Sequence, residues 1–314
     1  MTEVVQPVLI KAGSLFLACT GDGSIVSDCG VGLGLLYRDT RYLSRYELRI
    51  GGDTPLALMC SAAGGRSSIH QLSNRAVKQL DGKPLDTQSL GVRLDCSIDG
   101  EQLSLSNRFS FRNYTGDRVT FRISILIDAL FEDIFEMRGV EARTRGVRSS
   151  VETGTDSLLF CYAGADGHER TLAVTFSSPP NFRTENGAPV ADFDFALDTQ
   201  ATDTLSILFE VSESNIATSS AAPQPPFYDR AKIESDNPVL DRCLERSFKD
   251  LTLLGTELES GFIAGGAPWF IAPFGRDSIL AALQTLAFDP RPTEGVARLF
   301  AIHQGKANVT ETGE

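Results

Sequence analysis

Residues 119–125 read Val-Thr-Phe-Arg-Ile-Ser-Ile, and apolar and polar side chains alternate through the whole stretch. Similar alternation occurs in residues 103–106 and 205–209. A period of two residues is typical of a strand that buries one face. Glycine-containing turns separate such stretches, at residues 21–23, 51–53, 81–82, 99–100 and 186–187. Many short strands with no long helical pattern between them predict a mainly β fold, a large antiparallel β-sandwich over residues 1–212.

The sandwich pattern stops at residues 213–228, which are rich in serine, alanine and proline. Such a segment buries little apolar surface, and its prolines lack the backbone N–H that a strand or helix needs. We therefore expect residues 213–235 to form a linker between two domains.

After the linker the apolar residues recur at helical spacing. Residues 237–254 carry such a stripe, and Asn237 followed by Pro238 predicts the N-cap and first position of a helix. Further helices are predicted from about Asp277 or Ser278 to the Asp289-Pro290 stop, and over about residues 293–304. The residues expected to face inward from the last helix are Val296, Leu299, Phe300 and Ile302.

Amphipathic helices in water are stabilised mainly by packing of the apolar face, so these three helices need a partner. They can lie against the sandwich, self-associate as a homo-oligomer, or open a larger helical domain. We favour the last alternative, in which residues 236–314 are the first helices of an incomplete domain.

The composition excludes several kinds of partner and cofactor. A net charge of -12 without a long basic run argues against nucleic acid, because phosphate binding requires clustered Lys and Arg. The N-terminus lacks a secretory signal pattern, and no apolar stretch approaches the roughly 20 residues that span a membrane. The six cysteines lack CxxC spacing, which indicates free thiols in a reducing cytoplasm. The three histidines lie far apart in the sequence, which argues against a metal site. We expect neither a metal nor an organic cofactor.

Residues 264–277 concentrate aromatic and charged side chains between two predicted helices. Trp269, the only tryptophan, offers a flat ring for the C–H face of a sugar. Arg276 offers paired N–H donors and Asp277 two acceptor oxygens, which suit vicinal hydroxyls. On the alternative interpretation Asp277 caps the helix, Arg276 pairs with a carboxylate and Trp269 fills the core. These residues alone leave the two interpretations open.

Two further segments are dense in charge. Residues 35–48 include Arg38, Asp39 and Arg41 among tyrosines, which indicates either cross-strand ion pairs or a rim that reaches over a helical cleft. Residues 131–139 hold three acids, Glu132, Asp133 and Glu136. We favour a salt-linked interdomain contact there over acid/base catalysis.

Three motifs resemble one known family: GLLYRDTRYLSRYEL (34–48), FEDIFEMRG (131–139) and AGGAPWFIAPFGRDSI (264–279). They are similar to bacterial glycogen-debranching-type proteins, the amylo-alpha-1,6-glucosidases. The first two motifs resemble the N-terminal β-sandwich of the family. The third resembles the opening of its six-hairpin (α/α)6 catalytic domain. The resemblance spans almost the whole chain.

The resemblance implies substrate-binding roles for Arg276 and Asp277, which would grip the hydroxyls of the sugar at the cleavage point, with Trp269 beside them. It also implies inverting hydrolysis of alpha-glucans or related glucosides. In the family both catalytic carboxylates lie downstream of this motif, and the residues after about 304 stop resembling it. We therefore expect a truncated, cytoplasmic and catalytically inactive chain with no catalytic residue of its own.

One alternative stays open from another functional class. It is a non-catalytic carbohydrate-binding or assembly module that keeps the sandwich and the Trp269, Arg276 and Asp277 rim without turnover. The exact substrate, an oligosaccharide or a glucoside, is not specified by these residues.

Overall fold

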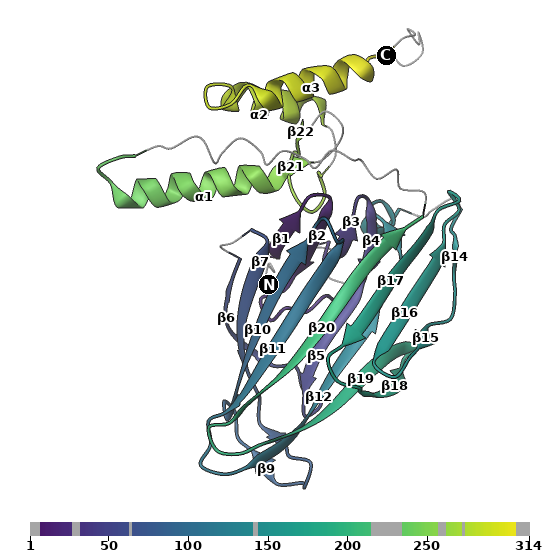
Figure 1. Ribbon diagram of the computed structural model, residues 1–314, viewed down its shortest axis with the longest axis vertical. Helices are drawn as coiled ribbons and strands as arrows, with labels where there is room; N and C mark the ends of the chain where they lie inside the picture. The colour runs from purple at the N-terminus through teal and green to yellow at the C-terminus, as the bar shows by residue number, and fades with distance from the viewer. Residues whose placement is uncertain are drawn as a thin grey trace. The chain divides into compact units, whose positions relative to one another are not determined.

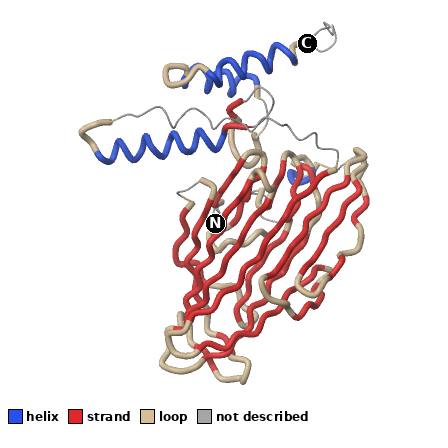
Figure 2. The backbone as a smooth tube through the Cα atoms, viewed as in Figure 1, coloured by secondary structure: helices blue, strands red, loops and turns tan. Residues whose placement is uncertain are grey.

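The computed structural model describes residues 7–26, 32–62, 65–140, 144–214, 234–256, 262–271 and 274–305 (Figure 1). The chain divides into two compact units, Met1–Ile216 and Ala217–Glu314. Figure 2 shows strands and loops in the first unit, apart from one short 3-10 helix, and α-helices in the second. Most of the predicted linker, residues 215–233, lies outside the described residues.

One layer of the first unit is a sheet of nine strands in the described residues, and all its pairs are antiparallel. In spatial order its strands are β14 (Val147–Arg148), β16 (Ser157–Ala163), β17 (Glu169–Phe176), β20 (Thr202–Glu213), β11 (Ser104–Asn113), β10 (Leu90–Asp99), β7 (Ser67–Ser73) and β6 (Leu56–Ser61), with β15 (Glu152–Thr153) also paired to β16.

Two smaller antiparallel sheets accompany it in the described part of the unit. The four-stranded one runs β18 (Asn181–Glu185), β19 (Ala188–Leu197), β12 (Val119–Asp128), β5 (Arg45–Ile50). The five-stranded one runs β1 (Val8–Ala12), β2 (Leu15–Cys19), β3 (Gly34–Tyr37), β4 (Thr40–Leu43), β13 (Glu132–Asp133). A small ladder joins β8 (Val77–Lys78) to β9 (Pro84–Leu85), and the 3-10 helix η1 covers Glu136–Arg138.

The alternating sequence pattern accounts for these strands. In β10 every second side chain, from Leu90 to Ile98, is buried, while the residues between face outward. The hairpin from β18 to β19 turns on Asn186 and Gly187, whose φ angles of 50 and 83° are those of a two-residue primed turn. The predicted mainly β fold, an antiparallel sandwich followed by helices, is confirmed.

Aromatic pairs join the layers and define the core. Phe111 of β11 packs against Phe195 of β19 with ring centroids 4.8 Å apart. Tyr46 of β5 packs edge-on against Phe209 of β20 at 5.5 Å. Since each pair links the large sheet to the four-stranded sheet, one continuous apolar core holds the sandwich together.

The second unit begins with the helix α1 (Pro238–Leu254). The Asn237 side chain accepts hydrogen bonds from the N–H groups of Val239 and Leu240, and Pro238 occupies the first turn. This start of the helix is as predicted, and it is stabilised by the cap. No residue of α1 is fully buried, although Phe248, Leu251 and Leu254 pack, partly buried, against Ile263 of β22.

Two more helices, α2 (Gly275–Thr285) and α3 (Arg291–Ile302), follow a short ladder of β21 (Gly255–Thr256) and β22 (Phe262–Ile263). They pack on β22 through a small cluster of buried residues, Phe262, Ala264, Ala282, Val296 and Leu299. Both helices start two residues or so before the predicted positions, within the usual uncertainty of helix ends. Ile302, expected to face inward, is instead 67% exposed at the C-terminal end of α3.

Candidate functional site

The aromatic and charged segment predicted from the sequence forms a tight loop and the first turn of α2, with residues 272–273 outside the described part. Gly266 and Phe270 exchange backbone hydrogen bonds of 3.3 and 2.8 Å, which close a narrow turn over Ala267, Pro268 and Trp269. The Ala267–Pro268 peptide bond is cis. The loop therefore presents Trp269, which is partly exposed, at its tip.

Two contacts attach this loop to α2. The buried hydroxyl of Ser278 donates a 2.9 Å hydrogen bond to the carbonyl of Ile263 on β22. A Cβ atom on Gly265 would lie 3.6 Å from the Cβ of Asp277, so the loop backbone runs directly beside that side chain.

Arg276 and Asp277 are both exposed, and they are the second and third residues of α2. The residue before the helix is Phe274, and no side-chain cap is formed there, so Asp277 does not cap the helix. No described carboxylate forms an ion pair with Arg276. The backbone N–H groups of the first turn add positive potential beside both side chains. A guanidinium and a carboxylate are thus exposed at the start of α2, and Asp277 lies beside the loop that carries Trp269.

Two more aromatic rings border the same loop. Phe270 and Phe274 are 46% and 39% exposed, and their rings meet edge-on with centroids 5.4 Å apart. Large apolar rings at a surface are typical of binding sites, because a ligand that covers them removes apolar surface from water.

The two charge-dense segments of the sandwich are brought together by the pairing of β4 with β13. Arg41 lies opposite Glu132, and Thr40 lies opposite Asp133. Arg41 is 5% exposed; it pairs with Glu132 and also donates a 3.2 Å hydrogen bond to the carbonyl of Leu33. The buried position of Arg41 fits the cross-strand ion pair and leaves it little surface for a ligand.

Arg38 and Asp39 occupy the tip of the β3–β4 hairpin and are exposed. The Arg38 guanidinium lies 5.3 Å from the centre of the Tyr37 ring and 3.6 Å from Glu213 at the end of β20. The backbone carbonyl of Asp39 accepts a 3.0 Å hydrogen bond from Ile134. The hairpin tip is thereby held against the segment that follows β13.

Partial desolvation of its carboxyl group, followed by the charge of Asp133, raises the pKa of Asp39. A raised pKa means that the folded chain holds the proton more tightly than the unfolded chain does. Ionised Asp39 therefore penalises folding at neutral pH, and the penalty falls as pH drops through the raised pKa.

We predict that Asp39→Asn raises the thermal midpoint at pH 7 by roughly 1–2 °C, a size typical of surface substitutions. The difference from the wild type should shrink as pH falls towards about 4, where the aspartate becomes neutral. Thermal melts of both proteins across this pH range measure the effect. A difference that is constant with pH would contradict the electrostatic explanation.

No group of three or more His, Cys, Asp or Glu in the described ranges is placed to hold a metal ion. Across the same ranges, no helix is long and apolar enough to cross a membrane.

A two-layer antiparallel sandwich followed by an α-helical unit is the class of fold that this chain adopts. The model of one family, described as the N-terminal domain of (some) glycogen debranching enzymes, matches residues 10–207. The match covers most of the sandwich, including the motifs at 34–48 and 131–139. The chain belongs to this family, which places it in the context of glycoside hydrolases.

Solved structures resemble the chain at low identity. A protein described as a kojibiose phosphorylase from the human microbiome is 6% identical, with a TM-score of 0.46 over 65% of this chain and 30% of its own. A GalM/aldose epimerase homologue from C. elegans is 9% identical, with a TM-score of 0.40 over 67% of this chain and 99% of its own. This chain thus spans 30% of the length of the first structure. No curated protein matches it by sequence.

Proposed function

We propose that this chain is the N-terminal portion of a cytoplasmic glycoside hydrolase of the amylo-alpha-1,6-glucosidase type, acting on alpha-glucans or related glucosides. The family match over residues 10–207 supports the enzyme class. The observation that carries the substrate class is the exposed pair of Arg276 and Asp277 at the start of α2, beside the loop of Trp269.

The chemistry of these side chains suits a pyranose ring. The Arg276 fork donates two parallel N–H bonds, and the Asp277 carboxylate accepts from two hydroxyls, so together they orient one sugar. Trp269 provides an aromatic face for its C–H bonds. Hydrolysis by inversion further requires a general acid and a general base roughly 6.5–9.5 Å apart. We assign neither role to a residue of this chain, so we propose that the chain alone binds sugar without cleaving it.

Titration calorimetry of the chain with maltose and maltotriose tests the binding role. Arg276→Ala and Asp277→Ala should each weaken binding about tenfold or more, since each removes a charged hydrogen-bonding group. The matched controls are Arg298→Ala and Glu294→Ala, which remove exposed charges from α3 and should leave affinity unchanged. If all four variants bind maltose and maltotriose as tightly as the wild type does, Arg276 and Asp277 do not contribute to binding.

Incubation with maltooligosaccharides and branched dextrin tests the absence of turnover. We expect no glucose release above the rate without protein. Release at enzymatic rates that survives purification to homogeneity would contradict the proposal and would locate catalytic carboxylates within the chain.

A second candidate function is a non-catalytic carbohydrate-binding or assembly module. The observation that favours assembly is the exposed apolar row of α2, in which Ile279, Leu280 and Leu283 are 45%, 51% and 56% exposed. Such a row in water favours self-association or a further helical surface. Sedimentation velocity at increasing concentration should show a homo-oligomer that Leu280→Glu and Leu283→Glu dissociate. A wild-type monomer at all concentrations would exclude self-association.

A further inference from the structure

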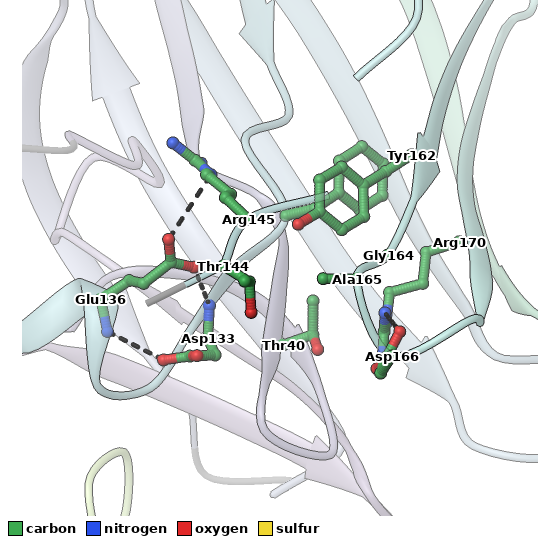
Figure 3. Close-up of a pocket in the computed structure, with 11 residues that line it drawn as sticks. Thr40, Asp133, Glu136, Thr144, Arg145, Tyr162, Gly164, Ala165, Asp166 and Arg170 are labelled. Carbon is green, nitrogen blue, oxygen red and sulfur yellow. Dashed lines mark hydrogen bonds and ion pairs between the residues drawn. The ribbon is translucent and has the colours of Figure 1, made fainter. Parts of the chain in front are cut away.

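A cleft of about 320 Å³ is lined by residues of the first unit alone. Its walls come from the β4–β13 ladder with the adjoining η1 segment, and from the turn between β16 and β17 (Figure 3). This volume falls at the lower end of small-molecule sites, which run from about 300 to 1,000 Å³. It therefore has room for a small ligand such as one or two sugar rings.

One wall is a rigid carboxylate pair with an arginine above it. The Asp133 carboxylate accepts hydrogen bonds of 2.7 and 2.8 Å from the N–H groups of Phe135 and Glu136. The Glu136 carboxylate in turn accepts a 3.0 Å bond from the Asp133 N–H, which completes a reciprocal capping box. Arg145 approaches Glu136 at 3.4 Å. Both partners of the capping box are therefore fixed before any ligand arrives.

The facing wall presents a second ion pair. The Arg170 guanidinium binds Asp166 at 2.6 Å and Glu213 at 2.9 Å, and it lowers the pKa of Asp166 to about 2. The pair therefore stays charged at neutral pH. A side chain on Gly164 would collide with both Asp166 and Arg170, so glycine at that position allows this wall to form.

Hydroxyl groups complete the cleft between the two walls. Tyr162 stacks on Phe131 with ring centroids 5.3 Å apart, and its oxygen accepts a 2.8 Å hydrogen bond from the Gly146 N–H. The Tyr162 hydroxyl still has its own proton to donate. Thr40 and Thr144 also line the cleft, and neither hydroxyl bonds to another described residue. Figure 3 shows Thr40 between the two ion pairs.

The charged groups that line the cleft favour a neutral ligand. The lining has three carboxylates and two guanidinium groups, so an anion meets carboxylates on both walls and a cation meets an arginine on each. Each ion pair offers a donor and an acceptor side by side, which matches a pair of neighbouring hydroxyls. Because the groups are held in place by their own bonds, little side-chain entropy is lost on binding.

We infer that this cleft is a second carbohydrate site, which binds a short neutral oligosaccharide between the Glu136–Arg145 pair and the Asp166–Arg170 pair. The inference rests on residues of the first unit alone. It therefore goes beyond the proposed function at α2 and can fail independently of it.

Two-dimensional NMR of the full ¹⁵N-labelled chain with maltotriose tests the inference. Amide shifts should change at residues 133–136, 144–145 and 164–166, in addition to any change at residues 262–278. The same titration with glucuronate and glucosamine, one anionic and one cationic, should leave the cleft amides unchanged. Shifts confined to residues 262–278, or no shifts at all, would overturn the second site. A response to glucosamine without one to maltotriose would replace it with a cation site.

Variants separate the two sites. Ala165→Trp places a large side chain from an exposed turn into the cleft and should weaken binding of maltotriose at the cleft amides about tenfold or more. Gly116→Trp is the matched control, because a Cβ atom there has no neighbour within 4 Å. Arg276→Ala combined with Asp277→Ala should leave the cleft response intact. Should Ala165→Trp not fold, Thr40→Val and Thr144→Val remove two hydroxyls instead, and unchanged affinity in both would overturn the site.

Discussion

Replacing Phe111 by alanine should lower the free energy of unfolding of the sandwich by about 3–5 kcal/mol, the cost typical of deleting a buried phenylalanine. Phe111 is 0% exposed and touches three other rings, with centroid distances of 5.9 Å to Phe109, 5.9 Å to Phe121 and 4.8 Å to Phe195. Two of these rings belong to the opposite sheet. The cavity therefore opens between the layers, where the strands cannot close it without shifting a whole sheet.

Urea denaturation followed by far-ultraviolet circular dichroism measures this loss through the strand signal, and Trp269 fluorescence reports separately on the second unit. Phe135→Ala is the matched control, because this ring is 60% exposed and its removal should change stability by less than about 0.5 kcal/mol. Equal shifts in the two variants would contradict the assignment of Phe111 to the core.

The strands of the sandwich could be predicted because each strand and turn is determined by residues close together in the sequence. Alternation in residues 119–125 decides which side chains of β12 are buried, and Asn186–Gly187 decides where β18 turns into β19. Which strands become neighbours is not local. β20 pairs with β11 and β17, segments far apart in the chain, and the alternating pattern is the same for any such order.

The charge-dense segments show the same limit. The sequence left Arg38, Asp39 and Arg41 open either as cross-strand ion pairs or as a rim, and the register of β3, β4 and β13 separates them. Arg38 and Asp39 lie at the hairpin tip, whereas Arg41 points into the unit, where Gly34 leaves space for its methylene chain. The rim role remains a proposal for the first two residues.

The cleft of the first unit is formed by three stretches that are distant in the sequence. None of these stretches predicts a binding site by itself. One signal was nevertheless in the sequence. Asp133 and Glu136 stand three apart, the spacing of a capping box, which identifies a structured turn instead of a free pair of catalytic acids. The hydrogen bonds and the ion pair of these two acids lie within the first unit, so the expected interdomain contact stays a prediction. The proposed ligand-binding surface arises only when β16 and β17 pack alongside.

The second large effect is expected at the ion pair of Arg41 and Glu132, which links two motifs of the family. Their side chains are 6% and 19% exposed. Removal of one partner from a buried pair leaves the other charge without compensation, at a cost of about 3–5 kcal/mol. We predict that Glu132→Ala destabilises the sandwich by about 3 kcal/mol, at the low end of that range because Glu132 keeps some contact with water.

The loss of stability in Glu132→Ala should come from the unpaired charge of the buried Arg41 guanidinium. Two comparisons distinguish this cause from the simple loss of a contact. Asp95→Ala breaks the Arg93–Asp95 pair, whose side chains are 49% and 36% exposed, and should destabilise the sandwich far less than Glu132→Ala does. Arg41→Met combined with Glu132→Leu removes both charges and should recover most of the stability lost in Glu132→Ala. Urea unfolding of the three variants measures both. A double variant as unstable as Glu132→Ala would show that the pair is needed for its geometry and not for its charge balance.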